Sequence, residues 1–265
     1  METRKWTQMG AGAVICIVIV ALVAMVASGC GSATASRGPL KLTETDNGKA
    51  FSIKTGETVE LIGAGRTDAG VHALGQVANF HTGHTLEAER FCDALNYHLK
   101  DDIRVRSSGE VSPGFHARFD ARFRRYRYLI ARERSALYRE LRWENPVEIN
   151  YHLLQHAASK LLGEHDFSSF CVTASLKENN QCRIDHSRWY ALGPLFVYEI
   201  RGNRFLHSMV RSLVGAMVNL ATIKPDNNMH NLTLEQFGSI IAAQSDERVV
   251  FTAPACGLYL VQVGY

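Results

Sequence analysis

The pattern of apolar and polar positions changes its period several times from residue 63 onward. Alternation of apolar and polar residues predicts strands at 77–82, 103–111 and 122–131, a hairpin at 189–205 and a last strand at 257–263. Apolar residues spaced three or four positions apart predict helices at 85–99, 151–162, 206–221 and 234–243. This mixture is typical of an α+β fold with mixed or antiparallel sheets.

Two of the predicted helices have a clear apolar stripe. The first begins at Thr85, a residue type suited to an N-cap, and presents Phe91, Leu95 and Leu99 on one face. The stripe of the helix at 206–221 consists of Met209, Leu213, Met217 and Leu220. We expect both stripes to face a core.

The segment 1–36 differs from the rest of the chain. Arg4 and Lys5 precede an uncharged apolar run at 11–27, which ends in small residues before Cys30. Such a segment predicts a secretory signal with a lipoprotein-type cleavage site, Cys30 being the lipidated first residue of an exported membrane lipoprotein. A permanent membrane span is the weaker interpretation because the run is short. Residues 31–38 are small except for Arg37, and they predict a tether.

Residues 37–61 form a second distinct segment. Two short alternating stretches flank Asp46-Asn47-Gly48, which predicts a β-hairpin. About 20 residues here resemble the opening of the chagasin-type cysteine-protease inhibitors. None of that family's inhibitory loops follows, so inhibition of proteases is not predicted.

The total charge says little about function, but one stretch of the chain is strongly basic. The net charge is +3, but the stretch 118–142 holds nine arginines against three acidic residues. This density is typical either of a solvated strand face or of a surface that follows phosphates. The six cysteines show no CxxC spacing, so neither a metal site nor a disulfide framework is predicted.

One loop, at 63–73, concentrates unusual residues. It holds three glycines with Arg66 and Asp68 between them, and His72 follows. Taken alone, it could be a tight turn in which Asp68 hydrogen-bonds its own backbone. It is not a phosphate-binding P-loop because the GxxxxGK[ST] spacing is absent.

This loop resembles the signature loop of the bacterial tRNA pseudouridine synthase A family. Further blocks follow in the family's order, at 75–80, 94–96, 115–119, 124–128, 165–170, 205–211 and 253–258. The resemblance covers roughly residues 55–265. It lacks the family's first strand and helix, whose place is taken by 1–36 and 37–61.

The resemblance implies an isomerase that converts uridine to pseudouridine at tRNA positions 38–40, in the anticodon stem-loop. It implies two ferredoxin-like halves around a central RNA-binding cleft, a catalytic half at 62–145 and a second half at 146–265, the first being incomplete. It also implies a cytoplasmic homodimer that binds tRNA and needs no cofactor or metal. The signal-like N-terminus conflicts with a cytoplasmic location.

By the same resemblance, Asp68 is the nucleophile and Arg211 is its cationic partner. Arg66 would contact the flipped-out nucleotide, and Tyr126 would stack on the uracil. The RNA contacts would come from Arg118, Arg122, Arg124, Arg125 and Arg127.

Each of these assignments has a structural alternative. Arg211 could be a surface arginine, and Arg66 could pair with Asp68. Tyr126 and Tyr128 share a strand face, so one of them could belong to the core. We interpret His207, like His72 and His116, as a residue of the fold or an RNA contact.

Two functions of different classes therefore compete. The first is a tRNA pseudouridine synthase. The second is a membrane-anchored lipoprotein fused to a synthase remnant that is inactive or only binds RNA.

Overall fold

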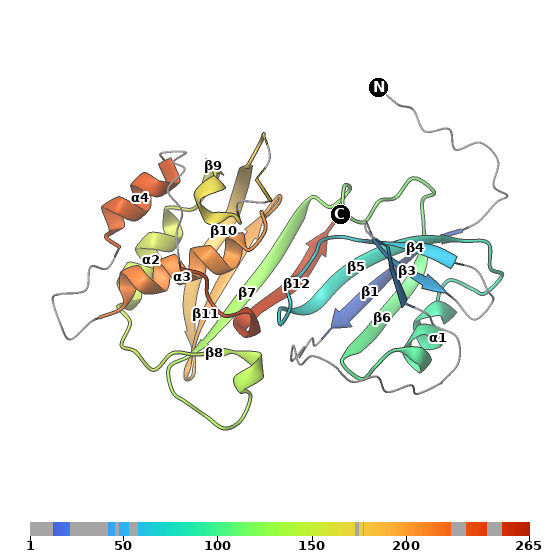
Figure 1. Cartoon of the computed structure of the whole chain (residues 1–265), viewed down its shortest axis with the longest axis horizontal. Coiled ribbons are helices and arrows are strands. Elements are labelled where there is room, and N and C mark those ends of the chain that lie inside the picture. The colour runs from blue at the N-terminus through green and yellow to red at the C-terminus, as the bar shows by residue number, and fades with distance from the viewer. Residues whose placement is uncertain are drawn as a thin grey trace. The chain divides into compact units, whose positions relative to one another are not determined.

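A computed structural model describes residues 13–21, 42–45, 48–52, 58–172, 175–176, 178–223, 232–242 and 251–265. The chain forms two compact units (Figure 1). Among the described residues, the first unit contains those up to Arg66 together with Gly75–Ala121, and the second contains Thr67–Leu74 and Arg122–Tyr265.

The first unit is a mixed α+β structure. Its strands are β1 (Ala13–Ala21), β2 (Leu42–Thr45), β3 (Gly48–Ser52), β4 (Thr58–Gly63), the greater part of β5 (His72–Thr82) and β6 (Ile103–Val111). They lie in the order β2-β3-β4-β5-β1-β6. The helix α1 (Arg90–His98) packs on β6.

The core of the first unit joins α1 to the sheet. Phe91 and Leu95 of α1 are buried with Phe80 of β5 and Val105 of β6. The predicted apolar face of this helix is therefore confirmed. The helix begins at Arg90 and not near Thr85, because Thr82 and His84 accept backbone N–H bonds within the preceding turn.

Part of the predicted signal segment is a strand. Residues Ala13–Ala21 form β1, which pairs antiparallel with β6 from Val14 opposite Val111 to Ala21 opposite Ile103, and also pairs with β5. Cys30 and the tether lie outside the described residues, so lipid attachment stays a prediction. In the part of the chain that the structure describes, no helix is long and apolar enough to span a membrane.

The hairpin expected around Asp46-Asn47-Gly48 is confirmed. Strands β2 and β3 pair antiparallel from Leu42 opposite Phe51 to Thr45 opposite Gly48. Strand β4 then pairs with β3 and, through Ile62 and Gly63, with β5.

The second unit has a mixed sheet with helices on one face (Figure 1). Its strands are β7 (Phe123–Ala131), β8 (Trp143–Glu144), β9 (Gly163–Asp166), β10 (Gln181–Leu192), β11 (Leu195–Gly202) and β12 (Leu258–Gly264). The order is β12-β7-β11-β10-β9, with β8 parallel to β7. The first residues of β5 pair parallel with β12. The α+β class with a mixed sheet is thus confirmed.

Three helices belong to the second unit: α2 (Tyr151–Ser159), α3 (Met209–Ala221) and α4 (Leu234–Ala242). Asn150 caps α2 by accepting N–H bonds from His152 and Leu153. The predicted stripe of α3 is confirmed, since Met209, Leu213, Met217 and Leu220 are all buried.

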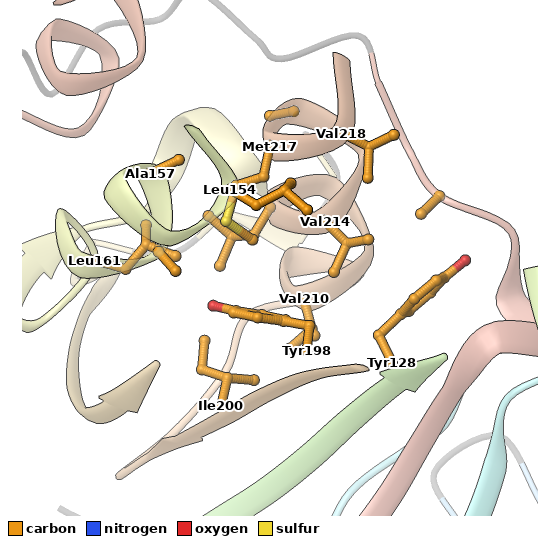
Figure 2. Close-up of a cluster of buried hydrophobic side chains, with 14 of the residues drawn as sticks. Tyr128, Leu154, Ala157, Leu161, Tyr198, Ile200, Val210, Val214, Met217 and Val218 are labelled. Carbon is orange, nitrogen blue, oxygen red and sulfur yellow. The ribbon is translucent and has the colours of Figure 1, made fainter. Parts of the chain in front are cut away.

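Figure 2 shows how these helices meet the sheet. Side chains of α2 and α3 pack over Tyr128 of β7 and over Tyr198 and Ile200 of β11. Tyr126, Tyr128 and Ile130 of β7 face this core, and Arg125 and Arg127 project from the opposite face of the strand. Burial of large aromatic and aliphatic groups holds α3 rigidly on the sheet.

Candidate active site

The loop that carries Asp68 is closed by its own backbone. The Val71 N–H donates to the Asp68 carbonyl oxygen at 3.0 Å. Gly70 has φ +80°, a conformation that suits glycine, and a Cβ there would lie 3.3 Å from the Cβ of Ala255. The turn therefore uses the Asp68 backbone and leaves its carboxylate to other partners.

Those partners lie at the start of helix α3. Arg211 Nη1 donates to Asp68 Oδ2 at 2.7 Å, and Ser208 Oγ donates to the same oxygen at 2.8 Å. The side chains of Asp68 and Arg211 are 24% and 20% exposed. The predicted pairing of Asp68 with Arg211 is present in the structure, and Arg211 is not an ordinary surface arginine.

Backbone contacts hold the Arg211 guanidinium in place. Its Nε donates to the Ala253 carbonyl oxygen at 2.9 Å, and the Ala253 N–H donates to the Arg211 carbonyl oxygen at 3.1 Å. Gly215 allows this close approach, since a Cβ there would lie 2.4 Å from the Phe251 carbonyl oxygen. The segment before β12 and helix α3 thus jointly orient the arginine.

The second oxygen of the carboxylate faces His207. His207 Nε2 lies 3.2 Å from Asp68 Oδ1, and the imidazole is half exposed. On its other side, His207 Nδ1 lies 2.8 Å from Ser175 Oγ. Because a carboxylate oxygen accepts, we assign a hydrogen to His207 Nε2.

Electrostatics favour the ionised form of Asp68. Burial alone would raise its pKa, but hydrogen bonds from Ser208 and Arg211, with the charges of Arg211 and His207, hold the pKa below its usual value. Ser208 is also the N-cap of α3, so the carboxylate lies at the positive end of the helix dipole. A half-buried carboxylate that stays ionised can act as a nucleophile.

The two tyrosines of β7 differ in their environment. Tyr128 is fully buried, and its hydroxyl donates to the Pro254 carbonyl oxygen at 2.6 Å. Tyr126 is partly buried and its ring packs edge-on against Phe205. Burial raises the pKa of Tyr126 to about 12, and the negative charge of Asp68 contributes to this rise. Tyr128 is thus the core residue, and Tyr126 is the tyrosine that interacts with Asp68.

The predicted RNA-contacting arginines occupy different environments. Arg125 Nη2 and Arg127 Nε each lie 2.7 Å from a carboxylate oxygen of Glu199, whose side chain is only 3% exposed. Burial alone would raise the pKa of Glu199, but hydrogen bonds from Arg127 and Arg125 outweigh burial and hold the pKa below its usual value. Arg125 and Arg127 therefore neutralise a buried acid while their own side chains remain partly exposed.

The remaining arginines are less enclosed. Arg124 Nη1 donates to the Asn203 carbonyl oxygen at 3.1 Å. Arg122 is exposed in the second unit, whereas Arg66 and Arg118 are exposed in the first. The structure thus brings together Asp68, Arg211 and Tyr126 within one unit.

Two partners of the Asp68 carboxylate are not predicted from the sequence. The sequence places His207 among residues of the fold or RNA contacts, and it does not single out Ser208. A usable signal was present, because Ser208 directly precedes the apolar stripe of α3 and Arg211 follows in the first helical turn. Residues that cap a helix and residues of its first turn lie close together at its N-terminus.

Comparisons with known proteins agree with this geometry. The family model described as tRNA pseudouridine synthase matches residues 31–120 and 157–265. The matched range includes the whole of the segment 37–61, part of which resembles protease inhibitors.

Three similar proteins all carry the name tRNA pseudouridine synthase A. The protein from Acetivibrio thermocellus is 41% identical, over 82% of this chain and 87% of its own length. The protein from Rippkaea orientalis is 39% identical, over 82% of this chain and 72% of its own length. The protein from Bacillus pumilus is 35% identical, over 84% of this chain and 88% of its own length.

Proposed function

The chain belongs to the tRNA pseudouridine synthase family, and we propose that it isomerises uridine to pseudouridine in tRNA with the Asp68 carboxylate as nucleophile. The bond between N1 and the ribose C1′ breaks, and a bond between C5 and C1′ forms. C5 loses one proton and N1 gains one, so the reaction has no net oxidation or reduction. A carboxylate that bonds transiently to the base or the sugar, and is then released, is sufficient.

One observation carries this proposal: the partly buried Asp68 carboxylate is paired with Arg211 at 2.7 Å. A nucleophilic carboxylate must stay deprotonated when substrate displaces water from it. The Arg211 charge and the Ser208 hydroxyl meet that requirement, and both are fixed by the rigid helix α3.

Tyr126 provides a surface for the base. Its hydroxyl is protonated at neutral pH, and burial raises its pKa further, to about 12, so the ring is an uncharged stacking partner. Arg66 would fill the space that the extruded uridine leaves in the stem. Extrusion of a base costs a few kcal/mol, which a contact of this kind offsets.

RNA outside the reacting nucleotide is bound through its backbone. The contacts in our proposal come from Arg118, Arg122, Arg124, Arg125 and Arg127. Binding should weaken steeply with salt because each neutralised phosphate releases counterions. We further propose that the substrate is the anticodon stem-loop and that the active form is a homodimer.

A cytoplasmic location fits this function, since tRNA is found there. The competing hypothesis of an exported lipoprotein requires the apolar run at 11–27 to act as a signal. Residues Ala13–Ala21 of that run form β1 and pair with β5 and β6, which favours a role within the folded synthase.

The test is release of tritium from carbon-5-labelled uridine in tRNA. The full chain should release the label, whereas Asp68→Asn, which keeps the size of the side chain, should lower the rate by at least about 1,000-fold because the amide is not a nucleophile. Binding of tRNA by the variant, measured by filter retention, should stay near that of the parent chain. Equal release from both proteins would rule out Asp68 as the nucleophile.

A further inference from the structure

Ser208 has a backbone conformation that few residues other than glycine adopt. Its φ is +59° and its ψ is 5°, in the left-handed region. Among the described non-glycine residues, only Tyr138 shares a positive φ. A left-handed serine is uncommon, and such residues concentrate at functional sites.

The Ser208 side chain does not cap the helix that it precedes. A serine at the N-cap of a helix normally accepts an N–H bond from the first turn, but Ser208 makes no such bond in α3. Its hydroxyl donates to Asp68 Oδ2 at 2.8 Å instead. The unusual backbone and the missing cap therefore have one common result, a second donor on the same carboxylate oxygen.

Two donors on one oxygen make the oxygens of Asp68 unequal. Arg211 Nη1 and Ser208 Oγ both bind Oδ2, whereas Oδ1 faces the half-exposed His207. When a carboxylate forms an ester, its other oxygen becomes the carbonyl and remains a good hydrogen-bond acceptor. The oxygen that forms the bond becomes a poor acceptor. Contacts to Oδ2 can therefore persist through the reaction, and the contact of Oδ1 with His207 cannot.

We propose that Ser208 is a positioning residue, which together with Arg211 holds Oδ2 so that Oδ1 is the atom that bonds to the substrate. This inference rests on the proposed role of Asp68 as nucleophile. A lone pair of Oδ1 forms the bond and returns to Oδ1 when the bond breaks, so the carboxylate is regenerated without oxidation or reduction. The second donor adds to the hydrogen bond from Arg211, so rotation of the carboxylate about its Cβ–Cγ bond must break two bonds to Oδ2.

The decisive variant is Ser208→Gly. Glycine suits the left-handed backbone, so the variant should melt at about the temperature of the parent chain. Loss of the hydroxyl should lower kcat on the order of 10-fold and leave KM unchanged. A matched control is Tyr138→Gly, which relieves the same backbone conformation in an exposed loop and should not change kcat.

The pH dependence provides a readout that a purely structural role would not change. Asp68 faces Arg211 and Ser208 of α3, His207 before it and Tyr126 of β7. Removal of the Ser208 bond removes one cause that lowers the pKa of Asp68. The acid limb of kcat/KM should therefore move to higher pH in Ser208→Gly and stay in place in Tyr138→Gly.

His207→Gln tests which oxygen reacts. Because His207 Nε2 lies against Oδ1 and not against the anchored Oδ2, its loss should reduce kcat less than Ser208→Gly does. A larger loss in His207→Gln, or a Ser208→Gly enzyme with the kcat and pH profile of the parent, would overturn the inference. The Asp68→Asn variant separates a failure of the proposed nucleophile from a failure of the proposed role of Ser208. If Asp68→Asn stays active, the nucleophile assignment itself fails.

Discussion

At the scale of single residues, the ion pair between Asp68 and Arg211 determines the chemistry of the site. Asp68 needs both a positive neighbour and a fixed orientation, and the arginine provides both. Its Nη1 binds the carboxylate while its Nε binds the Ala253 carbonyl. Lysine has the same charge but lacks this planar pair of donors.

The first prediction at this scale compares Arg211→Lys with Arg211→Gln. Both should lower kcat by about 10-fold or more because the donor to Oδ2 is lost or misplaced. Only Gln removes the charge that lowers the pKa of Asp68. Activity requires ionised Asp68, so it is present above the folded-state pKa and lost as the pH falls through it.

The acid limb should accordingly lie at higher pH in Arg211→Gln than in Arg211→Lys. The measurement is tritium release as a function of pH for both variants and the parent chain. Identical acid limbs in the two variants would mean that the arginine charge does not control the ionisation of Asp68.

At the scale of elements, helix α3 connects the core to the site. Its buried stripe packs on β7 and β11, and its first turn presents Ser208 and Arg211. The segment before β12 crosses the helix at Gly215, where the backbones approach closely. Packing therefore sets the position of Ala253, and Ala253 sets the position of the Arg211 guanidinium.

Gly215→Ala tests this connection. The new Cβ would lie 2.4 Å from the Phe251 carbonyl oxygen and 3.1 Å from the Ala253 nitrogen, so the segment must move. We expect a loss of about 1–3 kcal/mol in the free energy of unfolding and a lower kcat. The measurements are urea denaturation and tritium release.

Gly238→Ala in α4 is the matched control, since a Cβ there meets nothing within 4 Å. Alanine favours the helix over glycine by about 0.5–1 kcal/mol, so this variant should be more stable and equally active. If Gly215→Ala behaved in the same way, the close approach would have no role in placing Arg211.

At the scale of the whole molecule, the residues of strand β1 belong both to the predicted export signal and to the folded sheet. Cleavage before Cys30 would remove Ala13–Ala21 and leave β6 without its antiparallel partner. An unpaired strand edge favours aggregation. Export with cleavage before Cys30 would remove Ala13–Ala21, whereas the folded synthase uses these residues as a strand.

The prediction is that a chain beginning at Cys30 melts at least about 5 °C lower than the full chain and aggregates. Removal of residues 1–11 alone keeps β1 and should have little effect. Circular dichroism melting and size-exclusion chromatography provide the comparison. Equal melting of the two truncated chains would mean that β1 contributes nothing to the stability of the first unit.

Local patterns predicted much of the secondary structure. The strand at 103–111 and the helix at 234–243 agree with β6 and α4 within one residue. The predicted start of α1 at Thr85 was wrong, since the helix begins at Arg90. The side chains of Thr82 and His84 accept backbone N–H bonds in a preceding turn, which the apolar periodicity does not reveal. The apolar run at 11–27 was ambiguous because a signal segment and an apolar strand have similar compositions.

The sequence by itself determined the α+β class and the family, because these depend on periodicity and on ordered motifs. The pairing of Asp68 with Arg211 was expected only from the family resemblance, since the two residues lie far apart in the chain. Only the tertiary structure decided which groups share the Asp68 carboxylate and which tyrosine is core. It also showed that Arg125 and Arg127 neutralise Glu199. Such contacts join residues far apart in the chain, and their geometry follows from the packing of α3, β7 and β11, which no local pattern contains.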